Sequence, residues 1–208
     1  MAITFYTNPM SRGGIVRWAL HEVGADYETS IISYGEEMKG DYLASINPMG
    51  KVPAITHDGR IVTECAAICH YLAETHPDAG LLPTDAERAA YYRWLFFAAG
   101  PLEQAVVNRS MGFEVPDDPQ KRGMVGYGHY GLVMDVIEQH FSDSDFAAGE
   151  RFTMADVYLG SQVAWGLQFG TVEDRPALRA YAERSTDREA ARQARAIDMK
   201  LIAEAQED

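Results

Sequence analysis

A turn that leads into a proline-headed strand constrains this chain more than any other stretch. It reads Asn47-Pro48-Met49-Gly50-Lys51-Val52-Pro53-Ala54-Ile55. Asn-Pro and Met-Gly-Lys favour turns, and the four residues after them favour an extended backbone. Because proline has no N–H, the head of this strand cannot pair fully within its own sheet. If the Val52–Pro53 bond is cis, the N–H and C=O of Val52 can face a ligand.

A helix start follows the strand closely. A turn at 57–60 and a short strand at 61–63 lead to Glu64-Cys65, where a helix is expected to open. The first turn of a helix has spare N–H donors and the positive end of the helix dipole, so it suits a carboxylate. The segment therefore offers an extended-peptide edge beside an anion site.

The residues before and around this segment predict a small α/β domain. Ile3–Tyr6 alternates as a strand does, and Gly24 ends the helix that follows. A strand joined to the first through one helix is expected to run parallel to it. The region 33–46 is weakly patterned, as a loop with a short helix would be. The expected order is strand 3–6, helix 12–23, strand 27–32, hairpin 53–63 and helix 64–76, which is the thioredoxin fold.

The rest of the chain reads as helical. Two prolines and a glycine at 77–83 mark a linker, and no alternating strand pattern survives after residue 63. Capping boxes are expected at Thr84–Glu87, Thr153–Asp156 and Thr186–Glu189. The predicted helices are 85–112 with a kink at Gly100-Pro101, 120–141, 154–168, 176–184 and 187–205.

These residues resemble those of a known family. Asn47-Pro48-x-Gly50-Lys51-Val52-Pro53 followed by Glu64-Cys65 resembles the glutathione-binding half of the cytosolic glutathione transferases, with their cis-proline and Glu/Gln-Ser pair. Thr153 and Asp156 match the family's buried capping motif. The resemblance implies a thioredoxin-like N-terminal domain (1–76), a linker (77–83) and an all-α C-terminal domain (84–208). One departure is Cys65, where the family usually has Ser or Thr.

The resemblance also implies roles for the glutathione-binding residues. Val52 and Pro53 would pair with the cysteinyl unit, Glu64 would meet the γ-glutamyl ammonium, and Cys65 would contact the α-carboxylate. Lys51, or else Lys39 or Arg12, would pair with the glycyl carboxylate. Taken without the family, Glu64 complements a helix dipole and Lys51 is simply solvated.

Two residues compete for the catalytic role. Ser11 lies in the turn after the first strand, where serine-type transferases have a serine that stabilises the thiolate; on base rates alone, a serine there is a helix N-cap. Tyr6 is the rival, because some transferases of the family use a tyrosine near the end of the first strand. With Ile3 and Phe5 facing inward, Tyr6 would point with Thr4 to the other face. We favour Ser11.

The second substrate is expected between the domains, against the aromatic-rich first long helix. Most of that helix's aromatic residues are expected in the core. The wall of the electrophile site is assigned to Met10, Phe97, Pro101 and Arg109.

Composition and spacing disfavour several other classes. The net charge of −13 and pI near 4.8 argue against nucleic-acid or anionic-membrane partners. Two cysteines make no disulfide framework, and with no leader or long apolar run the chain is expected to be cytoplasmic. Cys65, Cys69 and His70 lack the further ligands that a metal site needs. Gly126–Gly131 matches a dinucleotide-binding pattern without the strand that must precede it, so its glycines, together with Gly123, are interpreted as close helix contacts.

The sequence thus predicts a bacterial, serine-type, homodimeric glutathione transferase that adds the glutathione thiolate to an apolar electrophile. A glutathione-dependent disulfide reductase or peroxidase remains open, with Cys65 as a candidate thiol. So does a non-catalytic interaction module, which the retained ligand-site residues disfavour. The maleylacetoacetate isomerase branch is disfavoured because its Ser-Ser-Cys stretch is not matched by Asn8-Pro9-Met10-Ser11.

Overall fold

The computed structural model describes the backbone of residues 2–207 and their side chains other than those of residues 37, 39 and 207. The contacts divide the chain into two compact units. The first runs up to Leu82 and takes in the chain from Arg188 onward, and the second spans Pro83–Asp187. Each unit is described separately below.

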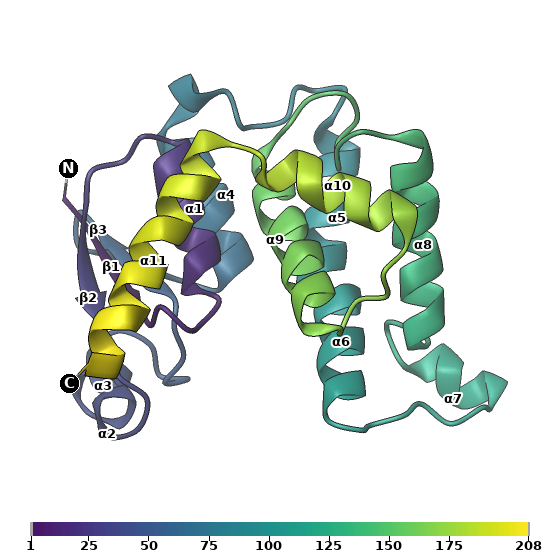
Figure 1. The fold of residues 1–208 in the computed structure, drawn as a ribbon, viewed down its shortest axis with the longest axis horizontal. Helices are drawn as coiled ribbons and strands as arrows, with labels where there is room; N and C mark the ends of the chain where they lie inside the picture. The colour runs from purple at the N-terminus through teal and green to yellow at the C-terminus, as the bar shows by residue number, and fades with distance from the viewer. Residues whose placement is uncertain (1, 208) are drawn as a thin grey trace. The chain divides into compact units, whose positions relative to one another are not determined.

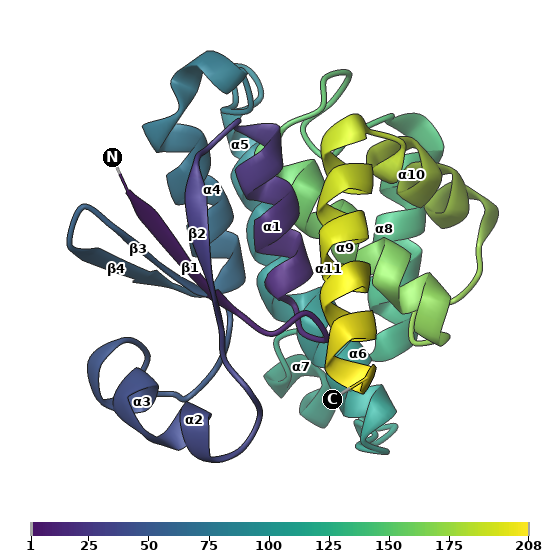
Figure 2. The ribbon, with the colours of Figure 1, turned by 60° about the vertical axis from the view of Figure 1, so that its left-hand side comes forward.

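A four-stranded mixed sheet forms the centre of the first unit (Figures 1 and 2). Its strands are β1 (Ile3–Thr7), β2 (Tyr27–Ile31), β3 (Ala54–His57) and β4 (Arg60–Thr63), in the order β2-β1-β3-β4. β1 and β2 are parallel, and the other two pairs are antiparallel. This is the predicted thioredoxin-like fold.

The two faces of the sheet carry different layers. Phe5 is fully buried on the face covered by α1 (Gly13–Glu22) and α4 (Cys65–Thr75), where the guanidinium of Arg17 lies 5.1 Å from its ring centroid. Tyr6 turns to the opposite face, as the alternation predicted. It packs there against a cluster that includes Tyr42 from α3 (Asp41–Ser45), close to the short α2 (Glu36–Lys39).

The last helix, α11 (Glu189–Glu207), packs along α1 in the first unit (Figure 2). Arg17 Nε lies 2.8 Å from Asp198 Oδ1, and Arg188 forms a bidentate pair with Glu22 at 2.6 and 2.7 Å. The helical pattern of residues 84–208 predicts that this helix belongs to the helical domain. The contacts instead group the last helix with the first unit, because its charged partners lie on α1.

The regular elements of the second unit are all helices among its described residues, apart from an isolated bridge between Phe146 and Gly149. Its central helix, α9 (Met154–Phe169), is buried on nearly all sides up to Val163, as expected of a helix with other helices around it. The unit comprises α5 (Arg88–Phe97), the π-helical turn η2 (Ala98–Leu102), α6 (Glu103–Ser110), α7 (Pro119–Met124), α8 (Tyr130–Asp143), α9 (Met154–Phe169) and α10 (Pro176–Thr186). A short 3₁₀ turn, η1 (Pro77–Ala79), lies in the predicted linker.

Two of the predicted helices are divided. The helix expected at 85–112 comprises α5, η2 and α6, because Pro101 lacks the N–H that a regular α-helix needs there. The helix expected at 120–141 is broken between α7 and α8. Gly128 has φ +67° in that break, and Gly123 and Gly126 have no neighbour within 4 Å of a Cβ added to them. The interpretation as close helix contacts is therefore wrong for Gly123 and Gly126, whereas a Cβ at Gly128 would lie 3.0 Å from the Leu132 side chain of α8.

Two of the three predicted capping boxes form. In the first, Thr84 N–H donates to Glu87 Oε2 at 2.8 Å. In the second, Asp156 accepts from the N–H and hydroxyl of Thr153, both at 2.9 Å. The third does not form, because Thr186 is the last residue of α10 and donates its hydroxyl to Ala182 C=O at 2.8 Å.

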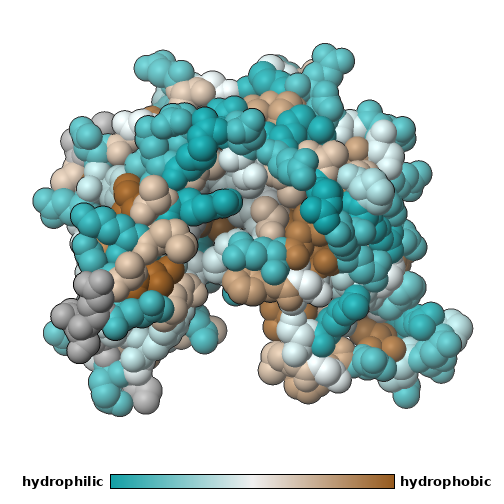
Figure 3. All heavy atoms as spheres, in the orientation of Figure 1, coloured by the Kyte–Doolittle hydropathy of each residue, from teal (hydrophilic) through white to brown (hydrophobic). Residues whose placement is uncertain are grey.

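Hydrophilic residues predominate on the face drawn in Figure 3, with hydrophobic residues in separate patches. Within residues 2–207, no helix combines the length and hydropathy that crossing a membrane requires.

Candidate functional site

Strand register brings the predicted site residues to one end of the first unit's sheet. Tyr6 pairs with Ala54, and Ala54 pairs with Thr63 on its other side. The chain therefore leaves β1, enters β3 and leaves β4 at the same sheet end. The next residues outward are the turn before α1, the Val52–Pro53 bond, and Glu64 at the start of α4.

The turn before β3 is held by side chains. Asn47, which is buried, donates from Nδ2 to Lys51 C=O at 2.8 Å and accepts from Met49 N–H at 3.0 Å. Tyr42 donates its hydroxyl to the same carbonyl at 2.6 Å. Burial raises the pKa of Tyr42 to about 12, so its hydroxyl stays a donor at neutral pH. Gly50 adopts φ +59°, which favours glycine.

The bond between Val52 and Pro53 is cis, as predicted. Val52 lies between this turn and β3, outside the strand pairing. Among the described residues, neither its N–H nor its C=O has a hydrogen-bond partner. A half-buried residue with both backbone groups open can accept an extended peptide as an added strand.

Glu64 has a backbone conformation that non-glycine residues rarely adopt, with φ 65° and ψ 117°. Residues held in sparsely populated backbone regions cluster at ligand sites. The Glu64 side chain is exposed, and α4 begins at the next residue. The N-terminal N–H groups of that 11-residue helix suit an anion.

Cys65 is buried, and its thiol donates to Arg12 C=O over 3.7 Å. This contact joins the start of α4 to the turn before α1. Cys69 is fully buried one turn further along, as expected of a small core residue. Within the described part of the chain, no three His, Cys, Asp or Glu side chains form a group that could hold a metal ion.

Ser11 is placed at the same sheet end, with its hydroxyl in local hydrogen bonds. It donates to Asn8 C=O at 2.6 Å and accepts from Gly13 N–H at 2.9 Å. These bonds lie within the turn, and the cap position of α1 is occupied by Arg12, so Ser11 is not the helix N-cap that base rates favour; its catalytic role stays a proposal. A Cβ at Gly13 would lie 1.9 Å from Thr7 Oγ1, so only glycine fits beneath the turn.

Sequence reasoning missed Asn8, which fixes this turn. Its side chain, largely buried, donates to Ile32 C=O at 3.1 Å and accepts from Met10 N–H at 3.0 Å. The Asn8-Pro9 pair predicts a turn, but the carbonyl partner of Asn8 lies on the chain after β2 and gives no local signal in the sequence. Tyr6 remains the rival, with its ring centroid 5.7 Å from that of Tyr42.

The remaining predicted residues lie as follows. Lys51 is exposed, and among the described residues no carboxylate lies within ion-pair distance of it; the side chain of Lys39 lies outside the described part. Met10 is 62% exposed beside Ser11.

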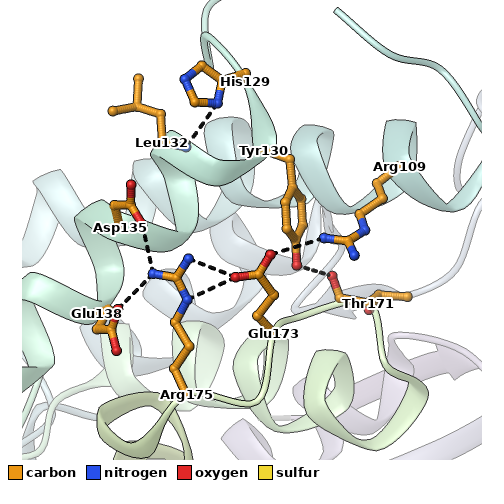
Figure 4. Close-up of polar contacts among 9 residues, drawn as sticks. All are labelled: Arg109, His129, Tyr130, Leu132, Asp135, Glu138, Thr171, Glu173 and Arg175. Carbon is orange, nitrogen blue, oxygen red and sulfur yellow. Dashed lines mark hydrogen bonds and ion pairs between the residues drawn. The ribbon is translucent and has the colours of Figure 1, made fainter.

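The other residues predicted for the electrophile site lie in the helical unit. Phe97 contacts Trp94 with ring centroids 5.2 Å apart, and Pro101 lies in η2. Arg109 lies over Tyr130, 4.0 Å from its ring centroid (Figure 4).

Comparisons with known proteins define the family. The sequence profile of the glutathione S-transferase N-terminal domain matches residues 14–75, and that of the C-terminal domain matches residues 129–189. A maleylacetoacetate isomerase of Pseudomonas aeruginosa is 33% identical over 189 residues, which is 86% of this chain and 88% of that protein. The glutathione S-transferase GstA of Escherichia coli O157:H7 is 29% identical over 151 residues, covering 70% of this chain and 73% of its own.

Solved structures support the same family assignment. A glutathione transferase homologue from Sulfitobacter with bound glutathione has a TM-score of 0.77 and 26% identity, over 95% of this chain and 99% of its own. The protein is thus an enzyme of the transferase class with a thioredoxin-like and an all-helical part. The chain belongs to the glutathione transferase family.

Proposed function

We propose that this enzyme activates glutathione at the first unit's sheet end and adds its thiolate to an apolar electrophile. The observation that supports the proposal is the strand register, which brings the ends of β1 and β4 and the start of β3 to one end of the sheet, beside the segments that contain Ser11, Val52 and Glu64. Val52 would pair with the cysteinyl unit, and the N-terminus of α4 would hold the γ-glutamyl carboxylate, with Glu64 on the ammonium. Two similar solved proteins contain bound glutathione.

Ser11 would stabilise the thiolate by a hydrogen bond. A free cysteine thiol has a pKa of about 8.5, so only a few per cent is ionised at neutral pH. The Ser11 hydroxyl has one proton and donates it to Asn8 C=O. Donation to sulfur therefore requires the hydroxyl to rotate when glutathione binds, while it still accepts from Gly13 N–H. A lower thiol pKa raises the fraction of thiolate but also lowers its nucleophilicity, so part of the gain in rate is lost. Positioning of the electrophile therefore supplies the rest of the rate acceleration.

Kinetics of Ser11→Ala with an aryl halide test this proposal. Turnover should fall roughly tenfold or more, about 1.4 kcal/mol of barrier, while calorimetry gives a glutathione affinity within a few-fold of the original. Ser11→Thr keeps a hydroxyl and should retain more activity. Tyr6→Phe is the matched control; if it cripples turnover and Ser11→Ala does not, the role belongs to Tyr6.

A second candidate function is isomerisation of maleylacetoacetate. It is supported by relatives that carry that name, including one from Caenorhabditis elegans that is 44% identical over 155 residues, 69% of each chain. These likenesses weigh against the sequence-based reason for setting the branch aside, the missing Ser-Ser-Cys stretch. Side-by-side assays of isomerisation and aryl-halide conjugation separate the two activities.

The glutathione-dependent reductase or peroxidase is supported less well, because the Cys65 side chain on which a mixed disulfide would form is buried. A panel of disulfides and peroxides tests it. The non-catalytic module would bind glutathione, if at all, without turnover in any of these assays.

We also propose a cytoplasmic homodimer, as is typical of the family. Light scattering should then give about twice the chain mass of 23.1 kDa. A monomer at micromolar concentration would contradict the dimer.

A further inference from the structure

A cavity of about 390 Å³ lies within the helical unit, at the end of α6 and the start of α8. Its walls come from α6, from residues 112–115 after that helix, and from residues 127–131 around the start of α8. The volume is within the range of roughly 300–1,000 Å³ that small-molecule sites occupy. All of these residues belong to one unit, so the cavity is complete without the first unit.

Aromatic rings form much of its lining. Phe113 is 59% exposed at the cavity, and Tyr130 lies at the first position of α8. Tyr127 is buried and its hydroxyl accepts from Asn108 Nδ2 at 2.9 Å, which fixes its ring. Such a lining suits a flat apolar body, because offset ring contacts add to the burial of apolar area.

The cavity also presents a cationic group, Arg109. Its guanidinium carbon lies 4.0 Å from the centroid of the Tyr130 ring, and Nη1 lies 3.4 Å from Glu173 Oε1. Among the described residues this long contact is the one hydrogen bond or ion pair of Arg109, although a guanidinium has five N–H donors. The side chain is 48% exposed. Stacking on the Tyr130 ring fixes the plane of the Arg109 guanidinium and leaves the N–H groups along its edge free to bind a planar anion.

The partner of Arg109 is held more firmly by another residue (Figure 4). Glu173 Oε2 accepts from Nε and Nη2 of Arg175 at 2.9 and 2.7 Å, and Arg175 also contacts Asp135 and Glu138 at 2.8 and 2.7 Å. Glu173 therefore keeps two hydrogen bonds from Arg175 if Arg109 turns to a ligand.

Two other groups at the cavity affect whether it favours an anionic ligand. His129 accepts from Leu132 N–H at Nδ1, at 3.2 Å, so in the neutral ring the proton lies on Nε2, which can donate to an anion. Glu114 is the one acidic residue among the lining side chains that the structure describes, and its carboxylate opposes anion binding. Glu173, 3.4 Å from Arg109, opposes it too, so the carboxylate must replace Glu173 on the edge of Arg109 and gain a second donor from His129.

We propose that this cavity binds an aromatic carboxylate, with its ring among Phe113, Tyr127 and Tyr130 and its carboxylate on the edge of Arg109. The residues that line the cavity all belong to the helical unit, and one of them, Arg109, is also assigned to the wall of the electrophile site. Because the readout is binding without glutathione, failure of this inference can be told apart from failure of the proposed function.

Calorimetry with naphthoate and its uncharged analogue naphthamide tests the inference. The protein should bind naphthoate at least tenfold more tightly than naphthamide. Arg109→Gln should lower naphthoate affinity about tenfold or more, which corresponds to about 1.4 kcal/mol, and leave naphthamide affinity unchanged. Phe113→Ala should weaken both. Glu114→Gln should tighten naphthoate binding, because a like charge is removed.

The control is Arg88→Gln, which removes an exposed arginine paired with Asp85, away from the lining residues. It should leave both affinities unchanged, and circular dichroism should show that every variant is folded. Absence of saturable naphthoate binding to the unchanged protein would overturn the inference. So would equal naphthoate affinity in folded Arg109→Gln, or tighter binding of naphthylmethylamine than of naphthoate.

Discussion

Arg17 of α1 and Asp198 of α11 form a buried ion pair in which Nε and Oδ1 lie 2.8 Å apart. The two residues are 181 positions apart in the chain. Their side chains are 1% and 11% exposed. Tyr27 Oη and Thr29 Oγ1 accept from Nη1 of Arg17 at 3.2 and 3.3 Å, which satisfies part of the buried guanidinium.

Removing one partner of this pair should therefore destabilise the protein strongly. Asp198→Leu leaves the Arg17 charge buried without its carboxylate and should cost roughly 3–5 kcal/mol of unfolding free energy in urea titrations. The double variant Arg17→Met with Asp198→Leu should recover much of this loss. As a control, Asp85→Asn removes an exposed pair and should cost about 1 kcal/mol or less. A loss below 1 kcal/mol for Asp198→Leu would contradict the assignment.

Gly13 is expected to tolerate no side chain. An added Cβ would lie 1.9 Å from the hydroxyl of fully buried Thr7, so the start of α1 must shift. Gly13→Ala should cost about 1–3 kcal/mol of stability and lower turnover, because Gly13 N–H also holds the Ser11 hydroxyl. Gly126→Ala, where nothing lies within 4 Å, is the matched control and should be near neutral. Equal effects of the two variants in thermal melts and assays would refute this packing argument.

The acid stability of the helical unit should depend on Glu87. The hydrogen bond from Arg151, chiefly, lowers the pKa of Glu87 to about 2 from 4.5. A depressed carboxyl pKa stabilises the folded state above pH 4.5, and this stabilisation is lost as the pH falls toward 2. Arg151 is 39% exposed, so the effect is about 1 kcal/mol or less after solvent screening.

Glu87→Gln should flatten the dependence of stability on pH between about 4.5 and 2, since Gln can still cap Thr84 N–H but does not titrate. Urea titrations at several pH values measure this. Glu204→Gln, at an exposed position on α11, is the control. An unchanged pH profile in Glu87→Gln would rule the mechanism out.

Local signals explain why most of the fold could be predicted. Alternation in Ile3–Thr7, the turn at 47–50 and the capping boxes at Thr84 and Thr153 each act within a few residues, and the structure contains all of them. The place of α11 depends on Arg17 and Asp198 meeting across the chain, which no local pattern encodes. The capping box predicted at Thr186 is wrong because a local pattern alone does not distinguish the start of a helix from its end, and Thr186 is the last residue of α10.

The site was predictable in part. The Val52–Pro53 bond and Glu64–Cys65 follow from turn and helix-start chemistry together with the family resemblance. Asn8 anchors the first turn through a partner 24 residues away, Ile32. Arg109 likewise stacks on a ring 21 residues away, that of Tyr130. Helical periodicity placed Arg109 on a helix, but the rings beside it became evident only from the fold.

Cys65 is expected to act as a structural substitute for serine. A thiol is a weaker donor than a hydroxyl, whereas the N–H groups and dipole of α4 do not depend on the side chain. Cys65→Ser should therefore keep glutathione affinity or tighten it by at most about 1 kcal/mol, and Cys65→Ala should lose little. Because the thiol is buried against Arg12 C=O, mass spectrometry should show slow alkylation at neutral pH. Rapid alkylation that glutathione prevents, with loss of reductase activity in Cys65→Ser, would favour the redox alternative.

The pKa of glutathione's thiol in the complex is the most direct test of the central claim. Thiolate absorbance in the ultraviolet, followed across a pH titration of the saturated enzyme, reports this pKa. The account predicts a value well below about 8.5 in the unchanged protein, and a return toward 8.5 in Ser11→Ala at saturating glutathione. Each unit of difference corresponds to about 1.4 kcal/mol in favour of the thiolate. A pKa near 8.5 in both proteins, or one equally depressed in both, would contradict activation by Ser11.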